Sequence, residues 1–142
     1  MTFPQALSPK ATATFNKIIK GCENVGDSNQ IFSDNGFMPV SVECIGEITT
    51  GSFAGTKVYS ICHFYSQNSD LMRDPEVTFY KFVTGKVFPA SYRQDGLGID
   101  RTYMTIEDEK IRFNANAQKD LVSFCAGTWF PNIEEQNDLD AQ

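Results

Sequence analysis

The fold is decided by residues 57–83, KVYSICHFYSQNSDLMRDPEVTFYKFV. Apolar and polar side chains alternate over Lys57–Tyr65 and again over Glu76–Val83, which is the period of a β-strand. The residues between these two stretches are polar and form turns readily, so the chain is predicted to reverse direction there. We therefore expect two antiparallel strands, joined by a loop, at the centre of the chain.

The same alternation extends to both sides of this pair of strands. It predicts one strand before the pair, at residues 40–45, and two strands after it, at residues 87–93 and 99–106. The polar segment 23–36, before the first of these strands, is predicted to be an ordered loop. Together the strands form a five-stranded antiparallel meander sheet.

One helix is predicted before the strands in the sequence, and one is predicted after them. Ser8 and Pro9 are favourable N-cap and first-turn residues, and apolar residues follow them at helical spacing. Asn114 or Asn116 can cap a second helix, whose apolar stripe would cover one face of the sheet. Pro131 is expected to interrupt or end this helix. The expected fold class is α+β, with an N-terminal and a C-terminal helix packed on the five-stranded sheet.

Length and composition favour one domain. The 142 residues contain no repeat and no linker, so we expect a single domain over 1–142 with an ordered core at about 8–136. The four cysteines are scattered singly, which favours reduced structural thiols over disulfides or zinc ligands. No apolar run reaches the ~20 residues of a membrane span, and the first residues carry no basic cluster before an apolar stretch. A cytoplasmic protein without a membrane partner is expected.

The charge of the chain limits its partners. The formal net charge is −6, whereas binding to nucleic acid depends on Lys and Arg side chains that neutralise phosphates. The acidic balance therefore argues against a nucleic-acid partner. It fits a protein partner with a basic surface, or a protein that imitates DNA in order to occupy a DNA-binding protein. The oligomeric state is left open.

The densest group of polar residues lies between the second and third predicted strands. It contains the only histidine, His63, and three carboxylates, those of Asp70, Asp74 and Glu76. A histidine with two or three carboxylates suits Mn²⁺, Fe²⁺ or, with water, Mg²⁺. Such an ion would activate water, and a phosphoester would be the natural substrate. No metal motif of fixed spacing is present, so the same residues also fit a loop held by its own turn hydrogen bonds.

The candidates for ligand or partner binding lie in this connection and in the turn after the fourth strand. They are His63, Tyr65, Gln67, Asn68, Asp70, Asp74, Glu76 and Asp95. The leading hypothesis is an accessory or protein-interaction domain, without a catalytic site or cofactor, whose loop 67–76 and Asp95 present an acidic recognition surface. The alternatives are a divalent-metal-dependent hydrolase of the phosphoester class that uses His63, Asp70, Asp74 and Glu76, and an acidic inhibitor that mimics DNA.

Several ordered motifs resemble those of a known family. The most specific are HFYSQNSDLMRDPE at 63–76 and YRQDGLG at 92–98. On these motifs the chain looks like a member of an uncharacterised bacterial domain-of-unknown-function family, and the likeness covers roughly residues 36–136. The family is associated with phages, plasmids and integrative elements, so the resemblance implies a small protein of a mobile element. The family pattern has glycine where this chain has Ser69, and a smoother closing helix where this chain has Pro131.

Overall fold

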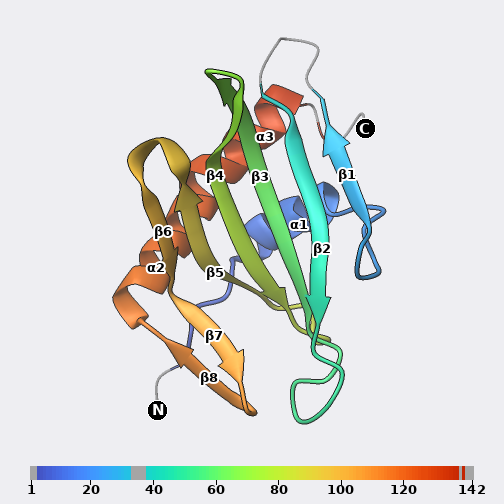
Figure 1. Ribbon diagram of the computed structural model, residues 1–142. Coiled ribbons are helices and arrows are strands. Elements are labelled where there is room, and N and C mark those ends of the chain that lie inside the picture. Colours follow the sequence, from blue (N-terminus) through green and yellow to red (C-terminus); the bar gives the residue numbers. More distant parts are fainter. Residues whose placement is uncertain (1–2, 33–37, 138, 140–142) are drawn as a thin grey trace.

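In this computed structural model, which describes residues 3–32, 38–137 and 139, the chain forms two layers (Figure 1). One layer is a six-stranded antiparallel sheet, ordered β1 (Ser28–Ile31), β2 (Val40–Glu47), β3 (Lys57–Gln67), β4 (Asp70–Lys81), β5 (Val87–Gln94) and β6 (Ile99–Thr102). The other layer is helical, with α1 (Pro9–Ile18), α2 (Ala115–Phe124), the π-helical turn η2 (Cys125–Trp129) and α3 (Phe130–Asn137). The short 3-10 turn η1 (Asp95–Leu97) follows β5, and β7 (Met104–Glu107) pairs with β8 (Lys110–Phe113) in a separate hairpin. None of the helices in the described residues is long and apolar enough to span a membrane.

The expected fold class is confirmed in its main features and corrected in its number of strands. The structure is α+β, with an antiparallel sheet, a helix near the N-terminus and a helix near the C-terminus. The prediction of five strands was wrong, because the sheet has six. The additional strand, β1, lies in the segment predicted to be a loop, of which residues 33–36 are outside the described part. The strand predicted at 99–106 was also wrong, since it divides between β6 and β7.

β3 and β4 are longer than predicted, because a turn of only two residues joins them. Asn68 and Ser69 form this turn with φ angles of 52° and 71°, the left-handed values that such hairpin turns require. Glycine adopts these angles most readily, and here the position is held by serine. The prediction of a loop at 67–76 was therefore wrong, and the three carboxylates of this segment belong to strand β4.

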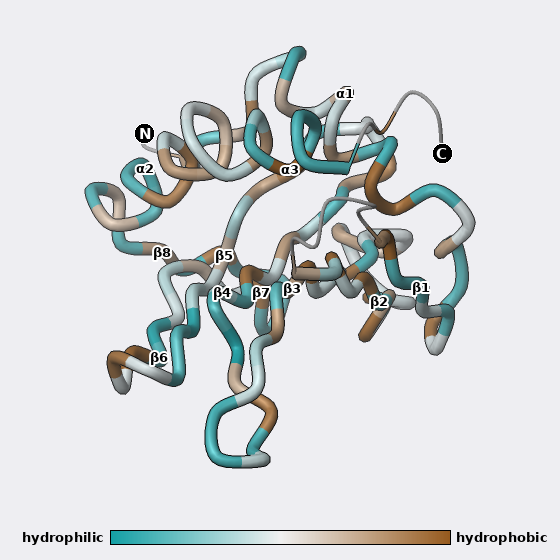
Figure 2. The backbone as a smooth tube through the Cα atoms, turned by 90° about the horizontal axis from the view of Figure 1, so that it is seen from above, coloured by the Kyte–Doolittle hydropathy of each residue, from teal (hydrophilic) through white to brown (hydrophobic). Residues whose placement is uncertain are grey.

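The helices cover one face of the sheet, and the core lies between the two layers (Figure 2). The ring of Phe15 on α1 lies 5.7 Å from that of Tyr59 on β3 and 5.1 Å from that of Phe79 on β4. Phe130 of α3 also packs on Phe79, at 5.9 Å. Burial of one such side chain contributes about 1.5–3 kcal/mol. Because side chains alternate along a strand, the residues next to these core residues point away from the helices.

The C-terminal helix continues past Pro131. The expected interruption takes the form of the wide turn η2, in which the N–H of Phe130 donates to the carbonyl of Cys125. Proline has no N–H to donate, and a π-helical turn directly before it changes the hydrogen-bond pattern without ending the helix. The α-helix resumes as α3 and reaches Asn137. Trp129, the last residue of the wide turn, is buried against β3.

Candidate functional site

The face of the sheet opposite the helices carries mostly polar side chains. Ser60, Thr78 and Ser91 are direct neighbours across β3, β4 and β5, and the hydroxyl groups of Thr78 and Ser91 share a hydrogen bond. In the next row, Glu76 lies opposite Arg93. The hairpin of β7 and β8 packs on one end of this face, over apolar residues of β4 and β5. We call the remainder the polar face, and its residues are Ser41, Glu43, Ser60, Glu76, Thr78, Ser91, Arg93 and Thr102.

A network of charged side chains lies at the border of the polar face with η1. The Arg73 guanidinium is 3.4 Å from Glu76 Oε1 and 3.3 Å from Asp95 Oδ2. Arg93 Nε is 3.1 Å from the other carboxylate oxygen of Asp95. The backbone N–H of Arg73 also donates to Asp95 at 2.8 Å, and this bond is the main reason that the pKa of Asp95 lies below its ordinary value. Two predicted candidates, Glu76 and Asp95, are thus joined through Arg73.

Of the predicted candidates near the hairpin tip, Tyr65 lies next to η1. The Tyr65 hydroxyl donates to Gln67 Oε1 at 3.5 Å. It also lies against Gly96, where an added Cβ would be 2.6 Å from the hydroxyl oxygen. Asn68 and Asp70 are exposed at the turn itself. Gln67, Asn68 and Asp70 therefore form one exposed projection rather than a closed site, and Tyr65 lies half-buried at its base.

His63 lies on the opposite side of β3, under the helices. It is 7% exposed, and its Nδ1 accepts a hydrogen bond of 3.3 Å from Trp129 Nε1. Its Nε2 has no hydrogen-bond partner among the described residues. Burial lowers the pKa of His63, while the nearby Asp74 acts in the opposite direction. Asp74 accepts a hydrogen bond of 2.7 Å from Gln94 Nε2. The neutral imidazole is therefore favoured, as a member of the core.

The four candidate metal ligands do not converge. His63 faces the helices, whereas Glu76 faces the other side of the sheet, where Ser60 Oγ donates to it at 2.6 Å. Asp70 lies at the hairpin tip, and Asp74 accepts a hydrogen bond from Gln94 of β5. In the described part of the chain, no three His, Cys, Asp or Glu side chains are placed to hold a metal ion. The geometry gives the hydrolase hypothesis no support.

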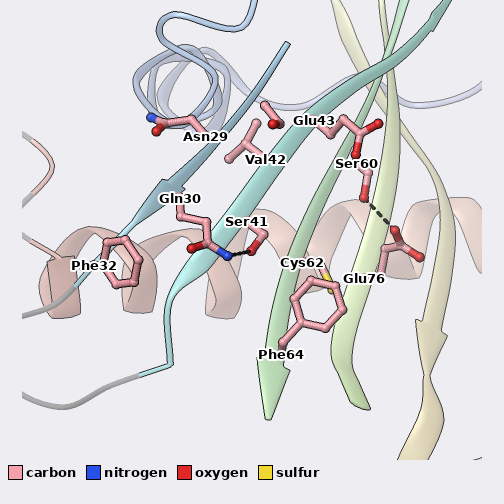
Figure 3. A pocket seen from close by; sticks show the side chains of 11 residues that line it. Asn29, Gln30, Phe32, Ser41, Val42, Glu43, Ser60, Cys62, Phe64 and Glu76 are labelled. Carbon is pink, nitrogen blue, oxygen red and sulfur yellow. Dashed lines mark hydrogen bonds between the residues drawn. The ribbon is translucent and has the colours of Figure 1, made fainter. Parts of the chain in front are cut away.

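A pocket of about 490 Å³ opens on the polar face, between β1 and β4 (Figure 3). Ser41 and Ser60 lie on its floor, and Phe32 and Phe64 lie on two sides of it. Glu43 also lines it. Sequence reasoning missed these residues as a site, because part of the pocket belongs to β1, which was not predicted. The alternation of Ser41 and Glu43 with buried residues of β2 was the signal that could have placed them together.

The cysteines offer no reactive thiol near this pocket. All four are free and buried. Burial, with the nearby Glu76 carboxylate, raises the pKa of the Cys62 thiol to about 12. A thiol with this pKa is almost entirely protonated at neutral pH, so Cys62 is a poor nucleophile.

A comparison with protein-family models identifies the family. The model described as Domain of unknown function (DUF6908) matches residues 13–139. The chain belongs to this family. The DUF6908 match runs from α1 to beyond α3, so it includes the polar face and the hairpin of β3 and β4. The expected membership of a domain-of-unknown-function family is confirmed, while the association with mobile elements stays a prediction. No match was found among curated proteins or among solved structures.

Proposed function

We propose that the chain is a protein-interaction domain that recognises its partner with the polar face and the charge network at its border. The observation that carries this proposal is the charge network of Arg73, Glu76, Arg93 and Asp95, which ion pairs and a backbone hydrogen bond fix on the sheet. Side chains that are ordered before binding lose little conformational freedom on binding. Such a surface is suited to a partner of complementary shape and charge.

The proposal modifies the hypothesis drawn from the sequence. Glu76 and Asp95 remain in the recognition surface, but Arg73 and Arg93 lie among the carboxylates and reduce its acidity. A DNA mimic requires an extended array of carboxylates, so the mixed charges of this surface do not favour that alternative. The setting that we infer from the motif resemblance is an accessory protein of a mobile element in a bacterial cytoplasm.

Site-specific photo-crosslinking tests the proposal and does not require the partner to be identified beforehand. A photoreactive phenylalanine analogue replaces the exposed Thr102 on the polar face, in cells that carry the gene of this protein. The matched control positions are Lys119 on α2 and Glu135 on α3, which are exposed on the helical layer. Adducts of one defined mass are expected from Thr102 and not from the controls. Adducts from the helical positions alone would contradict the proposal.

A further inference from the structure

The pocket on the polar face is rich in unused hydrogen-bond acceptors. Gln30 Nε2 donates to Ser41 Oγ at 3.1 Å, which leaves the amide oxygen of Gln30 without a described donor. Ser60 Oγ uses its proton on Glu76 at 2.6 Å, which leaves its lone pairs available. The exposed Glu43 carboxylate has no hydrogen-bond or ion-pair partner among the described residues. A ligand that carries donors only would satisfy these groups.

The charges around the pocket favour a cation. Glu43 and Ser60 are cross-strand partners, and Ser60 is bonded to Glu76, so the two carboxylates flank one serine. Arg73 is paired with Glu76, at 3.4 Å, and no described cation is paired with Glu43. One negative charge therefore remains uncompensated beside a concave surface, where a cationic group is attracted.

Two aromatic rings add a second requirement. Phe32 is 62% exposed, and Phe64 is half-buried on the other side of the pocket floor (Figure 3). Both rings lie at the end of the pocket away from Glu43, because Ile31, which precedes Phe32, pairs with Val40, and Phe64 is four residues along β3 from Ser60, the partner of Glu43. Four residues of a strand span about 13 Å. The rings therefore suit the aliphatic stem of a long cationic side chain whose charged end lies at Glu43.

We propose that this pocket binds the guanidinium group of an arginine on the partner protein. The inference rests on the proposed function and names the chemistry of the partner at the same face. Guanidinium has five N–H donors and no acceptor, which matches the acceptors of Glu43, Gln30 and Ser60. Its fork can bind the Glu43 carboxylate with two hydrogen bonds while the aliphatic stem of the arginine extends toward the aromatic end of the pocket. The ammonium group of lysine lacks both the fork and the plane.

Titration with short peptides, followed by the amide resonances of the isotope-labelled protein, tests the inference. The probe is the capped peptide Gly-Arg-Gly, and the controls are the same peptide with the neutral isostere citrulline or with lysine. Shifts are expected at residues that line the pocket, with affinity for the arginine peptide at least about tenfold above that for citrulline. Equal binding of the citrulline peptide, or of the lysine peptide, overturns the assignment.

A pair of matched variants locates the binding. Glu43→Gln removes the unpaired carboxylate, and Glu47→Gln removes another exposed carboxylate of β2 that does not line the pocket. Affinity for the arginine peptide should fall about tenfold in Glu43→Gln and stay unchanged in Glu47→Gln. Unchanged affinity in Glu43→Gln refutes the inference. If Thr102 forms crosslinks while the arginine peptide does not bind, this inference fails and the proposed function stands. If Thr102 forms none, the proposed function itself fails.

Discussion

Replacement of Trp129 by phenylalanine should destabilise the protein through one buried hydrogen bond. The indole N–H donates to His63 Nδ1 at 3.3 Å, in a place where His63 is 7% exposed and its Nε2 has no described partner. The variant leaves the Nδ1 acceptor unsatisfied as well, which costs about 1–3 kcal/mol. The smaller phenyl ring leaves empty space, which adds about 1 kcal/mol to the loss of stability. The stacking that Trp129 makes on Phe124, with ring centres 5.9 Å apart, can persist with the phenyl ring. The expected total is roughly 2–4 kcal/mol.

A double-mutant cycle separates the hydrogen bond from the change in packing. In Trp129→Phe with His63→Leu, the second substitution removes the Nδ1 acceptor that the first leaves unsatisfied, so the double variant should be more stable than the sum of the single effects implies. The expected coupling is about 1–2 kcal/mol, measured by urea unfolding with the slopes compared among the variants. Additivity within about 0.5 kcal/mol would refute the reasoning, because it would mean that the two side chains are energetically independent.

Two further predictions concern pH and the hairpin turn. Burial lowers the pKa of His63 from its ordinary value of 6.5. Below about pH 6.5 the folded protein therefore binds fewer protons than the unfolded chain, so the protein loses stability as the pH falls. Thermal melting between about pH 7 and pH 5 should show a smaller loss in His63→Gln, and an equal loss would exclude His63 as its source. Ser69→Gly relieves a φ of 71° and should stabilise the fold by up to about 1 kcal/mol in urea unfolding, whereas a decrease would contradict the assigned turn.

The sheet could be predicted wherever one side of a strand is buried. β2 shows this clearly, since Val40, Val42 and Cys44 are buried and the residues between them are more exposed. β1 could not be found in this way, because three of its four side chains are exposed and polar, and only its backbone pairing defines it. Apolar and polar residues alternate in a strand because one of its sides is buried. An edge strand with mostly exposed side chains therefore shows little of this alternation.

The hairpin was missed for a different reason. Asn68 and Ser69 form a two-residue turn without the glycine that usually marks one. Pro75 lies inside β4, although proline within a stretch of sequence argues against a strand. The polar residues between these positions therefore favoured a loop, and only the pairing of β3 with β4 places them in strands.

The candidate site was predictable in part. Glu76 and Asp95 were singled out from the sequence, and Arg73 joins them in the structure. The alternation along β3 could not say which side of the sheet the helices cover, so His63 was grouped with Glu76 although the two face opposite sides. Glu43 was missed because it is remote in sequence from the motif, and the sheet brings it next to Ser60.

The most direct test of the central claim is the affinity of two matched variants for the partner identified from the Thr102 adduct. Arg93→Ala removes a charged side chain of the polar face, and Lys119→Ala removes one from the exposed side of α2. If the polar face is the recognition surface, Arg93→Ala should weaken binding by about tenfold or more, and Lys119→Ala should leave it unchanged. Equal affinities of the two variants, or a loss confined to Lys119→Ala, would contradict the claim.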